Sequence, residues 1–586
     1  GTPGLLADVQ VTASRGQGRL NGAYRYFDAL PLRSDLNGDG VADLVVAAPL
    51  DGTAGSNAGA VLVFFGSADA NGLLDRSANE ADVRLLAQNS GDNFGVSICA
   101  GDVNGDGKDD LVVGANLADV GAAADAGMAY VFYGPFTTGS TRPALAANVK
   151  LSGETAVAGD RFGSVVDLGD VDGNGKLDVC VAAPQHDNGN PAVTPGALDT
   201  GCVYVFKGGS GLTSRSASAA DFKLDGANRN DRLGASFAFG DIDGDGDPEM
   251  IVGCPQYDPW TPVLLANAGA VYALECGANF HSQVADAALL QFTGEDVDDN
   301  FGATVAVGDV DGDGIGDLLV GAPGNDYYET NGGRVYVFRG GAALTSRGGA
   351  AADVKLSGMP THDSFGQSLR VTDLNGDGVF DLLVGAPHAD YFNDGNGRTY
   401  LFYGKPTLAD SVAISCDAMF NGENSQDEQL GTALSVVDIN ADHIADLVLS
   451  AARSALGAGR VYLYLSPASG QHVVSTADIK FSGTQPQGLF GAALEERTEP
   501  DGVGAGRNGH QIPRPRLLSV RTMTPGDRPN ATATARYARG SRHESRHASR
   551  LPRIWRLGLV DHEAMARRMK SSSRARMVCQ PTSSLS

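Results

Sequence analysis

The chain has 586 residues, of which 70 are Asp or Glu and 44 are Lys or Arg, so its formal net charge is −26. A body this acidic repels phosphate, so nucleic acid is not an expected partner, and no run of eighteen apolar residues provides a membrane span. The length suffices for one large domain plus an additional segment.

The first elements of the chain set a pattern that later elements repeat. Residues 7–11 (ADVQV) read as a short strand, and Phe27-Asp28 stand eight residues before an acidic loop at 35–43. The run LVVAAP follows this loop, and the alternating segment AGAVLVFFG follows after a variable stretch. Alternation and β-branched residues predict strands, and the Gly, Asp and Asn between them predict turns.

The same marks recur to about residue 490. A Phe-Gly or Leu-Gly pair stands eight residues before each later loop, a strand ending in Gly-Ala-Pro or a variant follows the loop, and a relative of ADVKLSG (352–358) ends the repeat. The acidic loops begin at Asp35, Asp102, Asp170, Asp241, Asp309, Asp373 and Asp438, at separations of 67, 68, 71, 68, 64 and 65 residues. Such a period predicts a repeat architecture.

The acidic loops have the chemistry of calcium sites. In DVDGDGIGD (309–317), acidic side chains at positions one, three and five, the carbonyl at position seven and the carboxylate at position nine can surround a hard cation. The first half matches an EF-hand loop, but strands flank it and the closing Glu is missing. The predicted ligands are Asp35, Asn37, Asp39, Val41, Asp43, Asp102, Asn104, Asp106, Lys108, Asp110, Asp170, Asp172, Asn174, Lys176, Asp178, Asp241, Asp243, Asp245, Asp247, Glu249, Asp309, Asp311, Asp313, Ile315, Asp317, Asp373, Asn375, Asp377, Val379, Asp381, Asp438, Asn440, Asp442, Ile444 and Asp446.

The predicted cofactor is therefore Ca²⁺, up to seven ions. Ala441 and His443 stand where the other loops have glycine, which predicts a weaker seventh site. Solvent-facing loops of this kind bind calcium at about 10⁻⁴ to 10⁻³ M, which favours a compartment outside the cytosol.

Each repeat contains four short strands, which predicts an all-β fold. A four-stranded sheet cannot bury both faces alone, so we expect a seven-bladed β-propeller over residues 1–490, with residues 7–11 completing the last blade as its fourth strand. Phe490-Gly491 begin an eighth copy that stops before its loop, so an eight-bladed ring is the alternative if the incomplete repeat is restored.

The joint spacing of Phe-Gly, the DxDxDGxxD loop and Gly-Ala-Pro resembles the FG-GAP repeats of the integrin α-subunit N-terminal β-propeller. The resemblance covers about residues 7–490. It implies calcium loops on one propeller face, with ligands and partners on the opposite face and the rim. The chain departs from the family pattern by carrying a recognisable loop in all seven repeats.

The segments after Gly-Ala-Pro vary most, and several place an Asp beside aromatic residues. Such surfaces suit sugars or a protein side chain, although Asp also caps turns and Tyr also packs on its own loop. The predicted ligand-binding residues on this face are Tyr257, Trp260, Tyr327, Tyr328, Tyr391 and Phe392. The Asp before each Phe-Gly pair is interpreted as a turn residue, and the cysteines as buried thiols without disulfides.

The residues from 491 to 586 differ from the repeats. From Glu495 onward the chain holds 18 basic and 8 acidic residues, which leaves about −36 for the preceding body. A disordered basic tail and a frame-shifted translation are both consistent with this composition. The HESRH motif (543–547) lies among Arg and Ser with Pro552 after it, and we interpret it as accidental.

The pattern predicts a calcium-binding, integrin-α-like extracellular module that recognises a protein or glycan on the face opposite the calcium loops. No nucleophile elbow or phosphate-binding loop is present, so we expect no enzymatic activity. One alternative is the accessory propeller of a secreted calcium-dependent hydrolase or lyase, as in relatives of phosphatidylinositol-glycan-specific phospholipase D. Another alternative is a purely structural surface-layer module.

Overall fold

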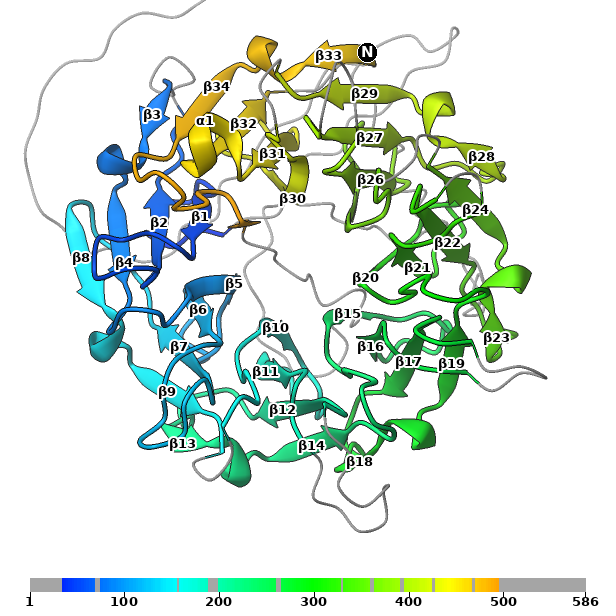
Figure 1. Cartoon of the computed structure of the whole chain (residues 1–586), viewed down its shortest axis with the longest axis horizontal. Helices are drawn as coiled ribbons and strands as arrows, with labels where there is room; N and C mark the ends of the chain where they lie inside the picture. Colours follow the sequence, from blue (N-terminus) through cyan, green and yellow to red (C-terminus); the bar gives the residue numbers. More distant parts are fainter. Residues whose placement is uncertain are drawn as a thin grey trace, which may run out of the picture. The chain divides into compact units, whose positions relative to one another are not determined.

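The alternating and β-branched runs form the predicted strands, and these strands assemble into antiparallel sheets. The computed structural model describes residues 34–68, 74–154, 158–187, 199–259, 265–327, 330–358, 363–389, 395–423, 427–465 and 469–494. These residues form seven sheets, which follow one another around a central axis (Figure 1). The all-β, seven-bladed propeller predicted from the repeats is confirmed.

Each sheet, or blade, has four antiparallel strands ordered from the axis outward. From blade 1 to blade 7, the innermost strands are β35 (Ala493–Leu494), β5 (Phe94–Gly101), β10 (Val165–Gly169), β15 (Ser236–Gly240), β20 (Thr304–Gly308), β25 (Ser368–Thr372) and β30 (Leu430–Val437). The second strands are β1 (Leu44–Ala48), β6 (Asp110–Ala115), β11 (Asp178–Ala183), β16 (Glu249–Cys254), β21 (Asp317–Ala322), β26 (Asp381–Ala386) and β31 (Asp446–Ala451). The third strands are β2 (Ala60–Phe64), β7 (Met128–Phe132), β12 (Cys202–Phe206), β17 (Ala270–Glu275), β22 (Arg334–Phe338), β27 (Arg398–Phe402) and β32 (Arg460–Tyr464). The fourth strands are β4 (Val83–Leu86), β9 (Val149–Ser152), β14 (Phe222–Asp225), β19 (Leu290–Thr293), β24 (Val354–Ser357), β29 (Ala418–Asn421) and β34 (Ile479–Ser482).

A fifth, short strand from the following blade pairs in parallel with the outer edge of each sheet, and the sequence did not predict it. These link strands are β3 (Arg76–Ser77), β8 (Ser140–Pro143), β13 (Arg215–Ser216), β18 (Gln283–Val284), β23 (Arg347–Gly348), β28 (Ser411–Val412) and β33 (Gly470–Val473). Each link strand leads into a 3₁₀ turn: η2 (Ala78–Glu80), η3 (Ala144–Ala146), η4 (Ala217–Ala219), η5 (Ala285–Ala287), η6 (Gly349–Ala351), η7 (Ala413–Ser415) or η8 (Val474–Thr476). The turn α1 (Ser454–Gly457) contains two residues with positive φ and is not a regular helix.

The hydrophobic core lies between the blades. Seven clusters of buried side chains each join two consecutive blades, and one of them joins blade 7 to blade 1 through Phe481, Phe490 and Phe64. The second strands, such as DLLVGA in β21, are buried at every position because both faces of a blade pack against neighbouring blades.

The Phe-Gly pair connects each blade to the preceding one. The Phe162 N–H donates to Ala126 O of blade 2 at 3.0 Å, and the Gly163 N–H donates to Ala182 O of its own blade 3 at 2.9 Å. Gly163 has φ +87°, and a Cβ atom there would lie 2.3 Å from Met128 O, so only glycine fits.

The ring closes differently from the prediction. Residues 7–11 lie outside the described residues, and the position predicted for them, the fourth strand of the last blade, is filled by β34. The apparent eighth repeat belongs to blade 1, because β35 pairs antiparallel with β1 and the Gly491 N–H donates to Ala47 O at 2.8 Å. At the outer edge, β3 of blade 1 pairs with β34. The described residues therefore close a ring of seven blades.

Candidate metal centre

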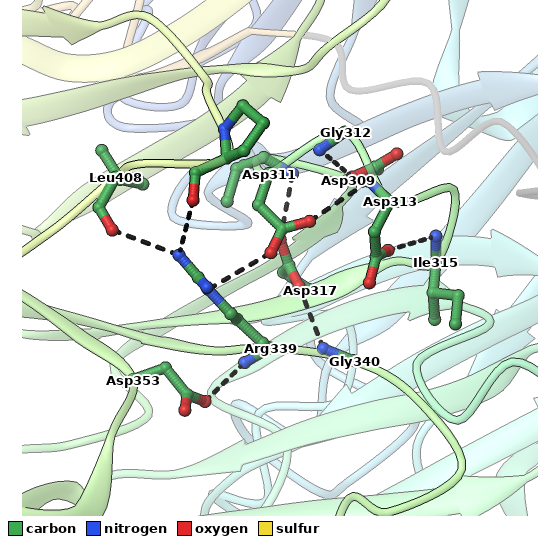
Figure 2. Close-up of polar contacts among 12 residues, drawn as sticks. Asp309, Asp311, Gly312, Asp313, Ile315, Asp317, Arg339, Gly340, Asp353 and Leu408 are labelled. Atoms are coloured by element: carbon green, nitrogen blue, oxygen red, sulfur yellow. Dashed lines mark hydrogen bonds and ion pairs between the residues drawn. The ribbon is translucent and has the colours of Figure 1, made fainter.

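In blades 2 to 7 the acidic loop connects the first and second strands, as in the turn between β20 and β21 (Figure 2), and in blade 1 it directly precedes the second strand, β1. Asp309 Oδ1 accepts the Gly312 N–H at 2.6 Å, and Asp309 Oδ2 accepts the Gly314 N–H at 2.7 Å. Gly312 and Gly314 have φ +80° and +88°, which wraps the backbone around the carboxylate at position one. Loop geometry thus directs the acidic side chains inward.

The carboxylate at position nine opens the second strand and is buried. In blade 5 Asp317 is 0% exposed; its Oδ2 accepts the Val310 N–H at 3.1 Å and its Oδ1 accepts the Gly340 N–H at 2.9 Å. Burial raises the pKa of these groups: to about 8 for Asp43 and Glu249, and to about 7 for Asp110, Asp178, Asp317 and Asp381. Each of these carboxylates is thus costly to ionise without a cation.

The structure brings predicted ligands together in three loops. One oxygen from each of positions one, three and nine lies within 4.8 Å of the others in Asp170/Asp172/Asp178, Asp241/Asp243/Glu249 and Asp309/Asp311/Asp317. In the other four loops, Asn replaces Asp at position three. Asp313, at position five, lies outside its group and accepts the Ile315 N–H at 2.9 Å.

The donor set fits a hard divalent cation. It consists of carboxylate, amide and carbonyl oxygens, which calcium prefers, and like charges this close need a counter-charge. Glu249 Oε1 is buried, and the structure shows no hydrogen-bond partner for it in the described part of the chain. An ion held by Asp241, Asp243 and Glu249 would satisfy this oxygen.

Six of the seven loops are also attached to the next blade by a hydrogen bond between described residues. The second loop residue is apolar and buried, and its carbonyl accepts a backbone N–H from the segment after the third strand of the following blade. The donor–acceptor pairs are Phe136–Leu36 at 2.7 Å, Gly209–Val103 at 2.7 Å, Gly277–Val171 at 2.8 Å, Gly341–Ile242 at 2.8 Å, Lys405–Val310 at 2.9 Å and, across the ring closure, Ser67–Ile439 at 2.9 Å.

The residue at or directly after the end of the third strand gives the loops different charges, which the sequence did not reveal. In blade 5 this residue is Arg339, whose Nε lies 3.2 Å from Asp311 Oδ2 (Figure 2). In blade 3 it is Lys207, whose Nζ lies 2.8 Å from Asp172 Oδ2. In blade 4 it is Glu275, paired across the strands with Glu249. Loops 3 and 5 thus carry their own counter-cation, whereas loop 4 gains a further acid.

Loop 7 departs from the others as its sequence suggested. Ala441 and His443 adopt φ 56° and 66°, in the region that glycine occupies elsewhere. The His443 N–H still donates to Asp438 Oδ2, at 3.1 Å. Two non-glycine residues in this region strain the loop, so a weaker seventh site stays our prediction.

The predicted ligand-binding residues differ in exposure, and four of the six lie outside the described part of the chain. Tyr327 is 70% exposed, whereas Tyr257 is half-buried and packs edge-on against Tyr272. Trp260, Tyr328, Tyr391 and Phe392 lie outside the described residues. Asp258 Oδ1 accepts the Asn267 N–H at 2.7 Å and Asp326 Oδ1 accepts the Asn331 N–H at 2.6 Å, so both carboxylates hold their own loops.

Three of the aspartates before the Phe-Gly or Leu-Gly pairs, Asp92, Asp231 and Asp299, accept a backbone N–H of their own turn, as predicted. Asp299 Oδ2 accepts the Asp296 N–H at 3.0 Å, and Asp231 Oδ2 accepts the Asn228 N–H at 2.9 Å. They are also buried, which raises the pKa of Asp231 to about 7 and that of Asp299 to about 6. The sequence identified these aspartates as turn residues, and that pattern does not indicate whether the side chain is buried.

The six cysteines in the described ranges form no disulfide, and five of them are buried, which agrees with the prediction. Cys202 lies opposite Ala183, and Cys180 lies opposite Val205, so these two thiols are in different cross-strand pairs.

No helix in the described ranges is long and apolar enough to cross a bilayer.

Comparison with known proteins finds relatives that match part of this chain. Curated relatives include integrin alpha-PS2 of Drosophila melanogaster, 30% identical over 33% of this chain and 12% of that protein. Human phosphatidylinositol-glycan-specific phospholipase D is 29% identical over 58% of this chain and 40% of that protein. The chain thus spans well under half of either relative. Among solved structures, rhamnogalacturonan lyase YesW aligns with 76% of this chain and 80% of its own at 12% identity and a TM-score of 0.31.

The family assignment comes from the repeat itself. The model of the FG-GAP repeat matches seven times, at residues 32–64, 94–132, 162–206, 233–274, 301–338, 365–402 and 430–464. Each match contains one acidic loop and the second and third strands of one blade. The chain therefore belongs to the FG-GAP repeat proteins, with one copy of the repeat in each of its seven blades.

Proposed function

We propose that this chain is a calcium-stabilised recognition module that works outside the cytosol and binds a protein or glycan on the face opposite its calcium loops. The observation that carries the proposal is the convergence of carboxylates at positions one, three and nine within 4.8 Å in three loops. Because these groups repel one another and the closing carboxylate is buried, calcium binding and folding of the ring are coupled.

The similarity to an integrin α subunit and to a phospholipase D supports this proposal, because in both relatives the matched region is only part of a longer protein. We assign the recognition surface to the loops between the second and third strands, because antiparallel strands place them at the opposite end from the calcium loops. We assign no reaction to this chain.

Thermal melting of the full chain with and without EGTA, with bound calcium counted by mass spectrometry, tests the calcium part. At calcium ten times above the dissociation constant, each occupied loop adds about 1.4 kcal/mol. We expect EGTA to lower the melting temperature clearly and to remove several ions per chain. An unchanged melting temperature and a metal-free protein before chelation would refute the proposal.

A second candidate is an accessory propeller beside a secreted hydrolase or lyase domain. It is favoured by the similarity to phosphatidylinositol-glycan-specific phospholipase D, which extends over 365 aligned residues. A catalytic domain encoded beside this propeller in the complete gene, and loss of that domain's activity on calcium removal, would support this candidate.

A further inference from the structure

A cavity of about 570 Å³ opens on blade 5, and neither the calcium chemistry nor the packing of the ring explains it. Its walls include Glu295, Asp296, Asp326, Tyr327, Arg334 and Lys355. Tyr327 lies between β21 and β22, whereas the calcium loop lies between β20 and β21, so the cavity is on the opposite face. The link strand β28 of blade 6 contributes Ser411 and Val412.

The floor of the cavity is a fixed polar network. The Arg334 side chain is 3% exposed; its Nε donates to Ser357 Oγ at 3.0 Å and its Nη1 to Glu295 Oε1 at 2.5 Å. Glu295 Oε1 also accepts the Tyr336 hydroxyl at 2.8 Å, and Lys355 Nζ lies 3.5 Å from Glu295 Oε2. A network satisfied in this way presents its remaining donors and acceptors at fixed positions, which lowers the entropic cost of binding.

Tyr327 forms an exposed aromatic wall above this floor. The Arg334 guanidinium carbon lies 3.6 Å from the centre of its ring, within the range of a cation–π contact. This contact restrains the ring even though the side chain is 70% exposed. An exposed aromatic ring beside ordered hydrogen-bonding groups provides both elements that orient a small polar ligand.

Composition and charge narrow the ligand class. The lining residues comprise Glu295, Asp296, Asp326 and Asp410 against Arg334 and Lys355, a net charge of −2, which disfavours acidic ligands. Val412 and Ala350 are its aliphatic lining residues, so an apolar anchor of a protein partner would find little surface to bury. A hydroxyl-rich ligand with one stacking face matches these walls better.

We propose that this cavity is a saccharide-binding site for non-acidic sugars, neutral or amine-bearing, of about one to three units. The inference rests on the proposed recognition function and deepens it by naming the ligand class and the blade. Tyr327 stacks on the sugar ring, Arg334 holds Tyr327 and Glu295 in place, Lys355 donates to a hydroxyl oxygen, and Asp326 and Asp410 accept from hydroxyl or ammonium groups.

Blade 7 offers a matched control, because it repeats the charged network with a different loop above it. There Arg460 Nη1 lies 2.8 Å from Glu423 Oε2, and Lys480 Nζ lies 3.9 Å from Glu423 Oε1. The loop at the position of Tyr327 is α1, which contains no aromatic residue. If the tyrosine wall is essential, a change in the blade 7 network leaves sugar binding unchanged.

Isothermal titration of the calcium-loaded full chain tests the proposal, with cellotriose, a glucosamine trimer and trigalacturonic acid as probes. We expect cellotriose or the glucosamine trimer to bind with one site per chain, and trigalacturonic acid not to bind. Tyr327→Ala weakens binding by about five-fold or more, the loss expected for one aromatic contact. Asp410→Asn weakens the glucosamine trimer selectively, and Arg460→Ala changes nothing.

Several results would overturn the proposal: no binding of either non-acidic trimer, preference for trigalacturonic acid, or equal binding by the Tyr327→Ala variant. Because Tyr327 is exposed, its substitution leaves the melting temperature unchanged, and melting of each variant checks this. If the sugars fail while EGTA still lowers the melting temperature, the cavity assignment is wrong and the calcium module stands. If EGTA has no effect, the proposed function itself fails.

Discussion

Replacing Arg339 by Gln tests whether the propeller tunes its metal sites with built-in counter-cations. The Arg339 guanidinium pairs with Asp311, whose side chain is 11% exposed, while Arg339 itself is 37% exposed. A divalent ion in loop 5 must compete with this pair for Asp311. We therefore expect Arg339→Gln to tighten calcium binding in loop 5.

The magnitude follows from the exposure of the pair. Half-exposed ion pairs contribute about 0.2 to 1 kcal/mol, which corresponds to roughly 1.4- to 5-fold in affinity. Arg339 also donates through Nη2 to Leu408 O of blade 6 at 3.2 Å, so its loss slightly weakens the metal-free protein. Lys207→Gln removes the corresponding ion pair in loop 3, and Arg76→Gln, which breaks an outer-edge pair with Asp82, serves as the control.

Because the chain has seven similar acidic loops, the assay must measure calcium occupancy for each loop separately. Long-wavelength anomalous diffraction from crystals equilibrated at graded calcium concentrations gives the occupancy of each loop within one crystal. In the native protein we expect loop 4, with its additional Glu275, to fill before loops 3 and 5. In Arg339→Gln crystals, loop 5 should move ahead of loop 3 while loop 4 stays unchanged. Equal or lower occupancy of loop 5 would show that Arg339 supports the loop rather than competing for it.

Three further predictions follow from burial and backbone geometry. Burial raises the pKa of Asp231 to about 7 and that of Asp299 to about 6, above the ordinary 3.8 of an aspartate. The calcium-free protein therefore loses stability as the pH rises from about 4 to 7, and melting of protein stripped of calcium beforehand should show higher temperatures at the acidic end of this range. The double change Ala441→Gly and His443→Gly relieves two positive-φ positions and should stabilise the protein by about 1 kcal/mol in urea unfolding; no gain would mean that loop 7 is unstrained. Gly163→Ala places a methyl group against Met128 O and should lower the free energy of unfolding by more than about 2 kcal/mol. Gly159→Ala, also at positive φ but with open space around it, should lower it by only about 1 kcal/mol. Equal losses of stability in the two variants would contradict the packing argument.

The number of blades and the position of the loops were predictable because the acidic loop recurs at a period of about 68 residues. Every copy after the first also has a Phe-Gly or Leu-Gly pair eight residues before its loop. Closure was not, since residues 7–11 and 490–494 both resemble fragments of a repeat. The pairing of β35 with β1, strands more than 400 residues apart, shows that β35 completes blade 1. The pairing of β34 with β32 shows that β34 already occupies the outer position of blade 7. Two-residue link strands such as β3 are too short for alternation to reveal them.

The charges around the loops were unpredictable for a similar reason. Lys207, Arg339 and Glu275 lie 22 to 29 residues after the closing carboxylate of their loop, and their importance depends on the strand register that brings the end of the third strand beside that carboxylate. The burial of Asp299 likewise depends on Asn325 and Tyr336, which belong to other segments. Sequence patterns report local periodicity, whereas these contacts arise from packing between distant segments.

The attachment of six of the loops to the next blade explains why calcium bound in one loop would act on more than one blade. Val310, directly after the first ligand of loop 5, receives the Lys405 N–H of blade 6, and the Phe380 N–H of loop 6 donates to Asp309 O. The Gly316 N–H of loop 5 in turn donates to Asp241 O of loop 4. An ordered loop therefore fixes backbone groups on both neighbouring blades, and a loop strained by unpaired carboxylates loosens them. The Ser67 N–H of blade 1 also donates to Ile439 O of loop 7, so the first and last blades of the chain are joined by the same kind of contact. Unfolding that begins at this closure therefore also disturbs an acidic loop.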